Sequence, residues 1–281
     1  MKILLIGASG LVGTAIEHVC AGKKYELISP GHTEVDIRNK NVLEELVAMH
    51  RPDAVINSVA MVGIDPCEDQ PAETFAINTT PAMHLAKSCS RAGSIFVQFS
   101  THAVFDGLKD TPYTEDDAPN PVNIYGASKL MSEYLALNMT ERHYVLRFST
   151  LFGKRRNNAM GFVDKVLKKL EDNTPLRIAD DRMDTPTYAA DAARELFKLI
   201  ESEKPFGLYH IANAGSVSYY DFTARLKDRM KSSSDLSRGK DSDFPSKTKK
   251  PLKTHIISNR IGPMRPWADA LDAFLADRAG R

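Results

Sequence analysis

Short apolar runs and longer stretches with an apolar residue every three or four positions alternate along the first half of the chain. The short runs predict buried strands, and the helical spacing predicts amphipathic helices. We expect strands over Lys2–Ile6, Tyr25–Ser29, Asp53–Asn57, Ser94–Ser100 and Tyr144–Phe148, and helices after Leu11, around 42–47, over 68–91 as one long element, and over 125–138. This alternation predicts an α/β fold with a Rossmann-type, doubly wound parallel sheet.

The second half of the chain is less regular. We expect helices over 158–170, 191–201, 219–230 and 267–277, and short strands over 176–178 and 208–211. Residues 231–250 are rich in Ser, Lys and Asp, with only Leu236 and Phe244 apolar, and we expect a mobile surface loop there. The patterns predict a Rossmann domain over 1–150 and a smaller domain mainly over 151–281, from which some segments return to the first.

The composition is that of an ordinary globular protein. Of the 281 residues, 42% are hydrophobic and 26% are charged, which excludes disordered, collagen-like and disulfide-scaffold chains. A formal net charge of +1 gives no general attraction to nucleic acid or to an anionic membrane. Three cysteines without CxxC spacing predict neither a zinc site nor a disulfide framework. The apolar run that ends at Gly7 is too short for a signal peptide or a membrane span, so we expect a cytoplasmic protein.

A glycine-rich turn links the first expected strand to the first expected helix. Its sequence, GASGLVG over residues 7–13, has the spacing Gly-x-x-Gly-x-x-Gly. Glycines there let the backbone approach a pyrophosphate, and the helix N-terminus favours the negative charge. We expect the turn to bind a dinucleotide cofactor; a tight turn without a ligand is the alternative. The expected contacts are Gly7, Ser9, Gly10, Leu11, Val12 and Gly13.

The residues after the second strand bear on which dinucleotide is bound. An acidic side chain there accepts a hydrogen bond from the ribose 2′-hydroxyl of NAD and repels the 2′-phosphate of NADP. This chain has Ser29-Pro30-Gly31-His32 instead, so we favour NADPH, with NADH as the alternative; a ribose that faces solvent would also explain these residues. We expect Asp36 and Ile37 to contact the adenine, and Ser58, Val59 and Ala60 to line the nicotinamide side.

Tyr125 and Lys129 stand one helical turn apart and project from one face of the same expected helix. Reduction of a ketone needs a proton for the developing alkoxide, which Tyr125 can supply. The Lys129 ammonium stabilises the phenolate and reaches the nicotinamide ribose, and Thr101, at the end of the preceding strand, can hydrogen-bond the substrate oxygen. A half-buried tyrosine, a surface lysine and a strand-end threonine without catalytic roles are the alternative. Asn57 and Asn78 are as consistent with a structural role as with cofactor binding.

The chain resembles a known family through motifs that follow one another along almost its whole length. These motifs are GASGLVG, VDIR, STHAVFDG, YGASK, RFSTLFG, TPTYAAD, GLYHIANAGSVSYYDF and MRPW. Together they resemble the dTDP-4-dehydrorhamnose reductase family of the extended short-chain dehydrogenase/reductases. The resemblance implies a small C-terminal substrate-binding domain and NAD(P)H-dependent reduction of the 4-keto group of a nucleotide-linked 6-deoxysugar. It places the catalytic groups on Thr101, Tyr125 and Lys129, with hydride delivered to C4 and Tyr125 as the proton donor.

Two departures from the family pattern lie where the family binds its sugar nucleotide. Thr101 is followed by His102-Ala103 in place of Asp-Tyr, and the stretch that resembles RTSW reads Arg147-Phe148-Ser149-Thr150. We expect His102, Phe148 and Arg182 to contact the substrate, the last as a clamp for a diphosphate. A strand-end histidine with its own partners and an exposed arginine in a plain turn are the alternatives. No metal site is carried over.

Three hypotheses of function follow. The leading one is a nucleotide-sugar reductase that forms a homodimer and has neither a nucleic-acid nor a membrane partner. A non-catalytic NADP-binding protein, resembling the regulatory subunit of methionine adenosyltransferase, is the second, and the presence of Tyr125 and Lys129 argues against it. A sugar-nucleotide epimerase is the third. It would need tightly held NAD, and the lack of an acidic residue after Ser29 argues against that.

Overall fold

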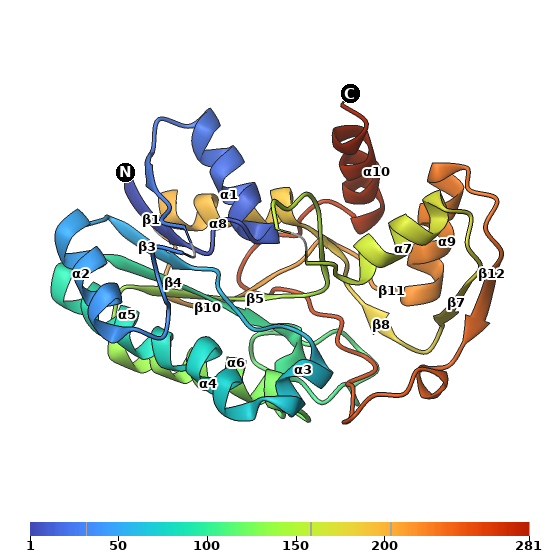
Figure 1. The fold of residues 1–281 in the computed structure, drawn as a ribbon, viewed down its shortest axis with the longest axis horizontal. Helices are drawn as coiled ribbons and strands as arrows, with labels where there is room; N and C mark the ends of the chain where they lie inside the picture. The colour runs from blue at the N-terminus through green and yellow to red at the C-terminus, as the bar shows by residue number, and fades with distance from the viewer. Residues whose placement is uncertain (32, 158, 203, 281) are drawn as a thin grey trace.

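The computed structural model describes residues 1–31, 33–157, 159–202 and 204–280. Its centre is a six-stranded sheet in the order β10-β5-β4-β3-β1-β2, with every strand parallel to its neighbours (Figure 1). The strands are β1 (Lys2–Ile6), β2 (Glu26–Ile28), β3 (Ala54–Asn57), β4 (Ile95–Thr101), β5 (His143–Phe148) and β10 (Gly207–Ile211). The structure confirms the prediction of a doubly wound parallel sheet.

Helices cover both faces of this sheet (Figure 1). One face carries α1 (Leu11–Gly22) and α8 (Ala189–Glu201), and the other carries α2 (Lys40–His50), α5 (Thr80–Ala92) and α6 (Ile124–Met139). Alternate strand residues point to opposite faces, so Ile3 and Leu5 pack with the first pair of helices, whereas Leu4 and Ile6 pack with the second group. Because both faces are buried, the strands are almost wholly apolar, as the sequence pattern predicts.

The strand order reverses between β1 and β3. From β1 the chain adds β2 on one side, then crosses to the other side to add β3, β4 and β5 in turn. Ligands of such sheets bind in the crevice outside the carboxyl ends of the two strands at the reversal. Gly7 follows β1 and Ser58 follows β3, so the fold brings two separate segments of the expected cofactor site to one crevice.

A second lobe lies beside the carboxyl edge of the sheet (Figure 1). Its strands form three two-stranded pairs, and its core is built around Phe152, Leu167, Phe222 and Phe274. The lobe contains β6 (Leu151–Phe152), α7 (Phe162–Glu171), β7 (Leu176–Ala179), β8 (Met183–Asp184), β9 (Thr187–Tyr188), β11 (Val217–Ser218), α9 (Tyr219–Met230), β12 (Leu236–Gly239) and α10 (Trp267–Arg278). Between these elements the chain returns to the first sheet to add α8 and β10.

The expectation of one long helix over 68–91 is wrong. The segment forms three helices, α3 (Ile64–Asp69), α4 (Pro71–Asn78) and α5. Proline supplies no amide proton and is tolerated only in the first turn of a helix. Pro71 and Pro81 therefore mark new helix starts, and apolar spacing alone does not show these breaks.

The loop expected over 231–250 contains regular structure that the sequence pattern did not predict. This segment contains β12, which pairs in parallel with β7, and a short 3-10 helix at Asp241–Asp243. Several of its charged side chains have partners: Lys240 Nζ lies 2.9 Å from Asp180 Oδ1, and Asp243 Oδ2 lies 2.7 Å from Arg177 Nη2. The helix expected from residue 158 begins at Phe162, after Gly161, and Asn158 itself lies outside the described residues.

Candidate active site

The glycine turn leaves no room for side chains between β1 and α1. Gly7 has a φ of 93°, a left-handed conformation that favours glycine, and a Cβ on it would come within 2.7 Å of Ser58 Oγ. A Cβ on Gly13 would come within 2.3 Å of the Gly7 carbonyl oxygen, so the helix packs directly on the turn. Gly10 is the N-cap of α1, whose first amide groups point into the crevice. This cradle fits the diphosphate of a dinucleotide.

A cavity of about 650 Å³ opens at this turn and continues along the carboxyl ends of β1, β2 and β3. Several of the predicted cofactor residues line it: Gly7, Ser9, Ser29, Asp36, Ile37, Val59 and Ala60. Gly10, Leu11, Val12 and Gly13 form the turn and the start of the helix behind it, and Ser58 Oγ donates to the carbonyl oxygens of Ile6 and Gly7 at 2.8 and 3.1 Å. His32 lies outside the described residues.

Two arginines that the sequence reasoning did not single out also line the cavity. Arg38 donates to Asp36 through Nε at 2.9 Å and Nη2 at 2.8 Å, and to Glu73 Oε1 at 2.8 Å. These hydrogen bonds hold the pKa of Asp36 at about 2, so this carboxylate stays charged at neutral pH. Arg156 reaches the cavity from the turn between β6 and α7. The sequence could have indicated a role for Arg38 in this cavity, because Arg38 stands next to the expected adenine contacts. Nothing in the sequence indicated such a role for Arg156.

Tyr125, Lys129 and Thr101 meet where β4 ends and α6 begins. The amide group of Gly126 donates to Asn123 Oδ1 at 2.9 Å, which caps the helix, and a Cβ on Gly126 would lie 2.3 Å from the Ala103 carbonyl oxygen. The start of α6 is therefore pressed against the turn that follows Thr101. This close approach brings Tyr125 close to the Thr101 side chain.

Burial shifts the pKa of both ionisable groups toward their neutral forms. Desolvation raises the pKa of Tyr125 to about 12, although the Thr101 hydrogen bond opposes the shift. Desolvation lowers the pKa of Lys129 to about 8, while the nearby charge of Glu133 opposes that shift. At neutral pH Tyr125 is a protonated phenol beside a lysine that is still mostly cationic. This is the protonation state in which Tyr125 can donate a proton.

A buried ion pair ties α6 to the sheet one turn beyond Lys129. Arg147 of β5 donates to Glu133 through Nη2 at 2.6 Å and Nε at 2.8 Å, and both side chains are only 2 to 3% exposed. Ser100 donates to the same carboxylate, and the Arg147 guanidinium lies 5.0 Å from the centre of the Phe105 ring. The pair fixes the rotation of α6 and therefore the direction in which Tyr125 and Lys129 project.

The two departures from the family pattern converge on one buried carboxylate, Asp184 of β8. His102 Nδ1 lies 3.0 Å from Asp184 Oδ1 and 3.2 Å from the Thr254 carbonyl oxygen; because both partners are acceptors, Nδ1 carries the proton. Thr150 and Ser149 donate to the same carboxylate. Burial raises the pKa of Asp184, but His102 and these hydroxyls outweigh it and hold the pKa at about 2. A sequence reading could not find this cluster because its parts come from four elements.

Four further residues that the sequence analysis singled out lie in the sheet core, in the second lobe or in structural hydrogen bonds. Phe148 does not line the crevice: it is buried in the sheet core, edge-on to Phe99 at 4.9 Å between ring centres. Arg182 lies in the second lobe with its guanidinium 4.8 Å from the Tyr219 ring centre and one nitrogen 3.4 Å from Asp241. Asn57 and Asn78 have structural partners. Asn57 Nδ2 donates to Gln98 Oε1 at 2.9 Å, and Asn78 Oδ1 accepts from the Met61 amide group at 2.7 Å.

Neither a metal-ligand cluster nor a membrane-spanning helix is found in the described part of the chain. Over the described ranges, no group of three or more His, Cys, Asp and Glu side chains is placed to hold a metal ion. In the same part of the chain, no helix is both long enough and apolar enough to cross a membrane.

Among parallel α/β folds, a helix with Tyr-x-x-x-Lys beside a Gly-x-x-Gly-x-x-Gly turn is typical of the extended short-chain dehydrogenase/reductases. This chain is an oxidoreductase of that class. The model of the family described as RmlD substrate binding domain matches residues 1–279, so the chain belongs to this family, that of the dTDP-4-dehydrorhamnose reductases. The resemblance in its motifs is thereby confirmed.

Individual relatives match over the whole chain. The spore coat polysaccharide biosynthesis protein SpsK of Bacillus subtilis is 30% identical over 99% of this chain and 98% of its own. The crystal structure of a dTDP-4-dehydrorhamnose reductase from Clostridium acetobutylicum, 28% identical, superposes with a TM-score of 0.94 and covers 100% of both chains. That of the Bacillus anthracis dTDP-4-dehydrorhamnose reductase in complex with NADP shares the fold at a TM-score of 0.93 and 24% identity, over 98% of this chain and 99% of its own.

Proposed function

We propose that this protein is an NADPH-dependent reductase of the 4-keto group of a nucleotide-linked 6-deoxysugar. One observation carries the proposal: Tyr125 lies beside the Thr101 side chain, with Lys129 one turn further along the same helix, at the sheet edge that also forms the dinucleotide cavity. The reductases among the relatives act on a substrate of this kind by name, which supports the same class of substrate here.

NADPH, when bound, supplies the hydride that adds to C4 of the sugar. The Thr101 hydroxyl orients the carbonyl oxygen by a hydrogen bond, and the Tyr125 hydroxyl gives its proton to that oxygen as negative charge develops on it. The resulting phenolate is stabilised by the Lys129 ammonium and regains its proton from solvent. The high pKa of Tyr125, about 12, keeps the donor protonated before the reaction.

The substrate would lie between the sheet edge and the second lobe. His102 is held by Asp184 through Nδ1, which leaves Nε2 as the ring atom available to a ligand. Arg182, which is stacked on Tyr219, is the cation of the second lobe that we propose for the substrate diphosphate. The cluster around Asp184 replaces the aromatic residue that the family places near its nucleotide, and we propose that it sets which sugar nucleotide is accepted.

The test is turnover with dTDP-4-keto-6-deoxymannose and NADPH labelled with deuterium at the transferred position. We expect oxidation of NADPH, followed by its absorbance, and deuterium at C4 of the product, detected by NMR. A parallel reaction is run in heavy water with unlabelled NADPH. Deuterium that enters C3 or C5 of the sugar from this solvent, without net oxidation of NADPH, would instead indicate an epimerase. Cofactor binding without any conversion of keto-sugars would indicate the non-catalytic alternative.

The pH dependence of kcat/KM provides a separate prediction. The Lys129 ammonium loses its proton as the pH rises through about 8. Its positive charge near Tyr125 is therefore present well below that pH and is lost well above it. We expect kcat/KM to fall as the pH rises through this range. Arginine stays protonated, so Lys129→Arg should retain some activity and lack this alkaline decline. A variant with an unchanged decline would assign the titration to another group.

A further inference from the structure

An ion pair between the two lobes lies at the mouth of the cofactor cavity. Arg156, in the turn between β6 and α7, places Nη2 2.5 Å from Oε2 of Glu17 on α1. The Ser29 hydroxyl, at the end of β2, donates to the other oxygen of Glu17 at 3.3 Å. Arg156 and Ser29 both line the cavity. The acidic group missing from the end of β2 is therefore supplied by a neighbouring helix, and it already has a cationic partner.

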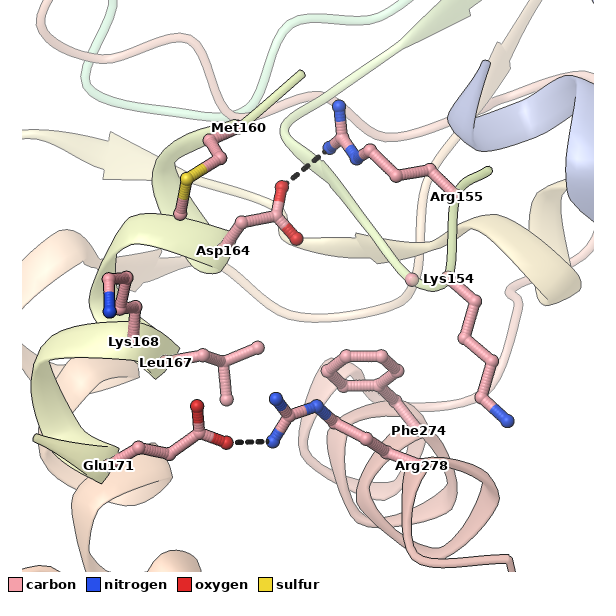
Figure 2. A pocket seen from close by; sticks show the side chains of 10 residues that line it. Lys154, Arg155, Met160, Asp164, Leu167, Lys168, Glu171, Phe274 and Arg278 are labelled. Carbon is pink, nitrogen blue, oxygen red and sulfur yellow. Dashed lines mark hydrogen bonds and ion pairs between the residues drawn. The ribbon is translucent and has the colours of Figure 1, made fainter. Parts of the chain in front are cut away.

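The turn that carries Arg156 contacts both lobes. The amide groups of Arg156 and Asn157 donate to the Ser9 carbonyl oxygen of the glycine turn at 3.3 and 3.2 Å. On the other side, the preceding residue turns away from the cofactor cavity: Figure 2 shows the Arg155 side chain directed at Asp164 of α7, at 2.7 Å. Arg156 therefore reaches the mouth of the cavity from a backbone that is anchored on both lobes.

We propose that Arg156 and Glu17 determine the choice between NADPH and NADH. This inference rests on the proposed function, which puts the adenosine ribose of the cofactor near Ser29. A 2′-phosphate there would take the guanidinium from Glu17 and form charge-assisted hydrogen bonds with Arg156. In NADH the Glu17 carboxylate would instead accept the 2′-hydroxyl and remain paired with Arg156. Arg156 thus favours NADPH, whereas Glu17 favours NADH. The pair as a whole excludes neither cofactor.

Arg38 offers a matched control. It lines the same cavity, and its side chain is 51% exposed, against 55% for Arg156. Its guanidinium is already held by Asp36, itself an expected contact of the adenine that NADPH and NADH share, and by Glu73. Loss of Arg38 should therefore affect both cofactors alike.

The experiment is fluorescence titration of the purified protein with NADPH and with NADH in the absence of substrate. For Arg156→Gln we expect the NADPH dissociation constant to rise by about 10- to 100-fold, the effect of losing a charge-assisted hydrogen bond, with NADH changed less than about twofold. For Glu17→Gln we expect the reverse, tighter NADPH and weaker NADH binding by about two- to fivefold. Arg38→Gln should leave the ratio of the two constants unchanged, and thermal melts check that each variant is folded.

Two results would overturn the inference while the proposed function stands. One is an equal loss of both cofactors in Arg156→Gln, which would place this side chain on the shared diphosphate. The other is selective loss of NADPH in Arg38→Gln but not in Arg156→Gln. A wild-type protein that binds neither cofactor would overturn the proposed function as well, so the two failures are distinguishable.

Discussion

Replacement of Tyr125 by phenylalanine is expected to lower kcat for keto-sugar reduction by about 10²- to 10⁴-fold, the usual contribution of a positioned general acid. The variant keeps the ring that fills the space between α6 and the turn after β4 and loses only the hydroxyl. That hydroxyl lies near the Thr101 side chain, and we expect no other group of the site to take over the proton transfer from its position. The measurement is steady-state turnover at saturating NADPH.

Two controls separate chemistry from folding and binding in this variant. The variant loses one hydroxyl and keeps the ring, so the free energy of unfolding should change by about 1 kcal/mol and the midpoint of thermal unfolding should move by only a few degrees. The NADPH dissociation constant should be almost unchanged, because the cavity around Ser29 and Ile37 is untouched. A Tyr125→Phe protein that retained more than about a tenth of the wild-type kcat would show that another group protonates the product.

Arg147→Met is expected to lower the free energy of unfolding by about 3–5 kcal/mol, the cost of leaving a buried carboxylate without its cation. Glu133 is 2% exposed and would retain the Ser100 hydroxyl as its hydrogen-bond partner, with the Lys129 charge nearby. The change should also disturb α6, so activity should fall together with stability. Urea denaturation followed by circular dichroism measures the loss, with agreement between near- and far-UV signals as the check on two-state behaviour.

The double variant Glu133→Gln with Arg147→Met gives the decisive comparison for this pair. It removes both charges, so its destabilisation should be smaller than the sum of the two single changes. The exposed pair Lys168 and Asp172, at 65% and 51% exposure, provides a matched surface control, for which Lys168→Met should cost no more than about 1 kcal/mol. Additive single effects at Glu133 and Arg147 would mean that the two charges do not stabilise one another.

The parts of the fold that the sequence predicted are those governed by local pattern. Buried parallel strands are continuous apolar runs, and Gly7, Gly10 and Gly13 stand at the tight junction between β1 and α1. The errors arose where the signal was weak or misread. Pro71 and Pro81 each start a new helix without interrupting the apolar spacing, and β12 is a polar strand whose partner, β7, lies far away in the sequence.

The residues of the candidate site also divide into those that local sequence predicted and those that depend on distant segments of the chain. Thr101, Tyr125 and Lys129 were predictable because a strand end and one helical turn define their neighbourhood. Their catalytic roles stay predictions until the variants are measured. Arg156 and Asp184 were not predictable, because each acts through contacts with elements from the other lobe, Glu17 in one case and His102 in the other. Phe148 was misassigned because a strand residue next to the crevice can still point into the core.

The late return of β10 to the central sheet has a consequence for synthesis. β10 pairs with β5 along Tyr144–Phe148, yet the ribosome makes β6 to α8, including the first part of the second lobe, before it makes Gly207–Ile211. At about 5–20 residues per second, roughly 3 to 12 seconds pass in which β5 is complete and its outer edge has no partner. An open edge of this apolar strand is a site for pairing between nascent chains. Translation pauses or chaperone supply in this window should therefore govern the soluble yield, and fragments that end near residue 150 should aggregate.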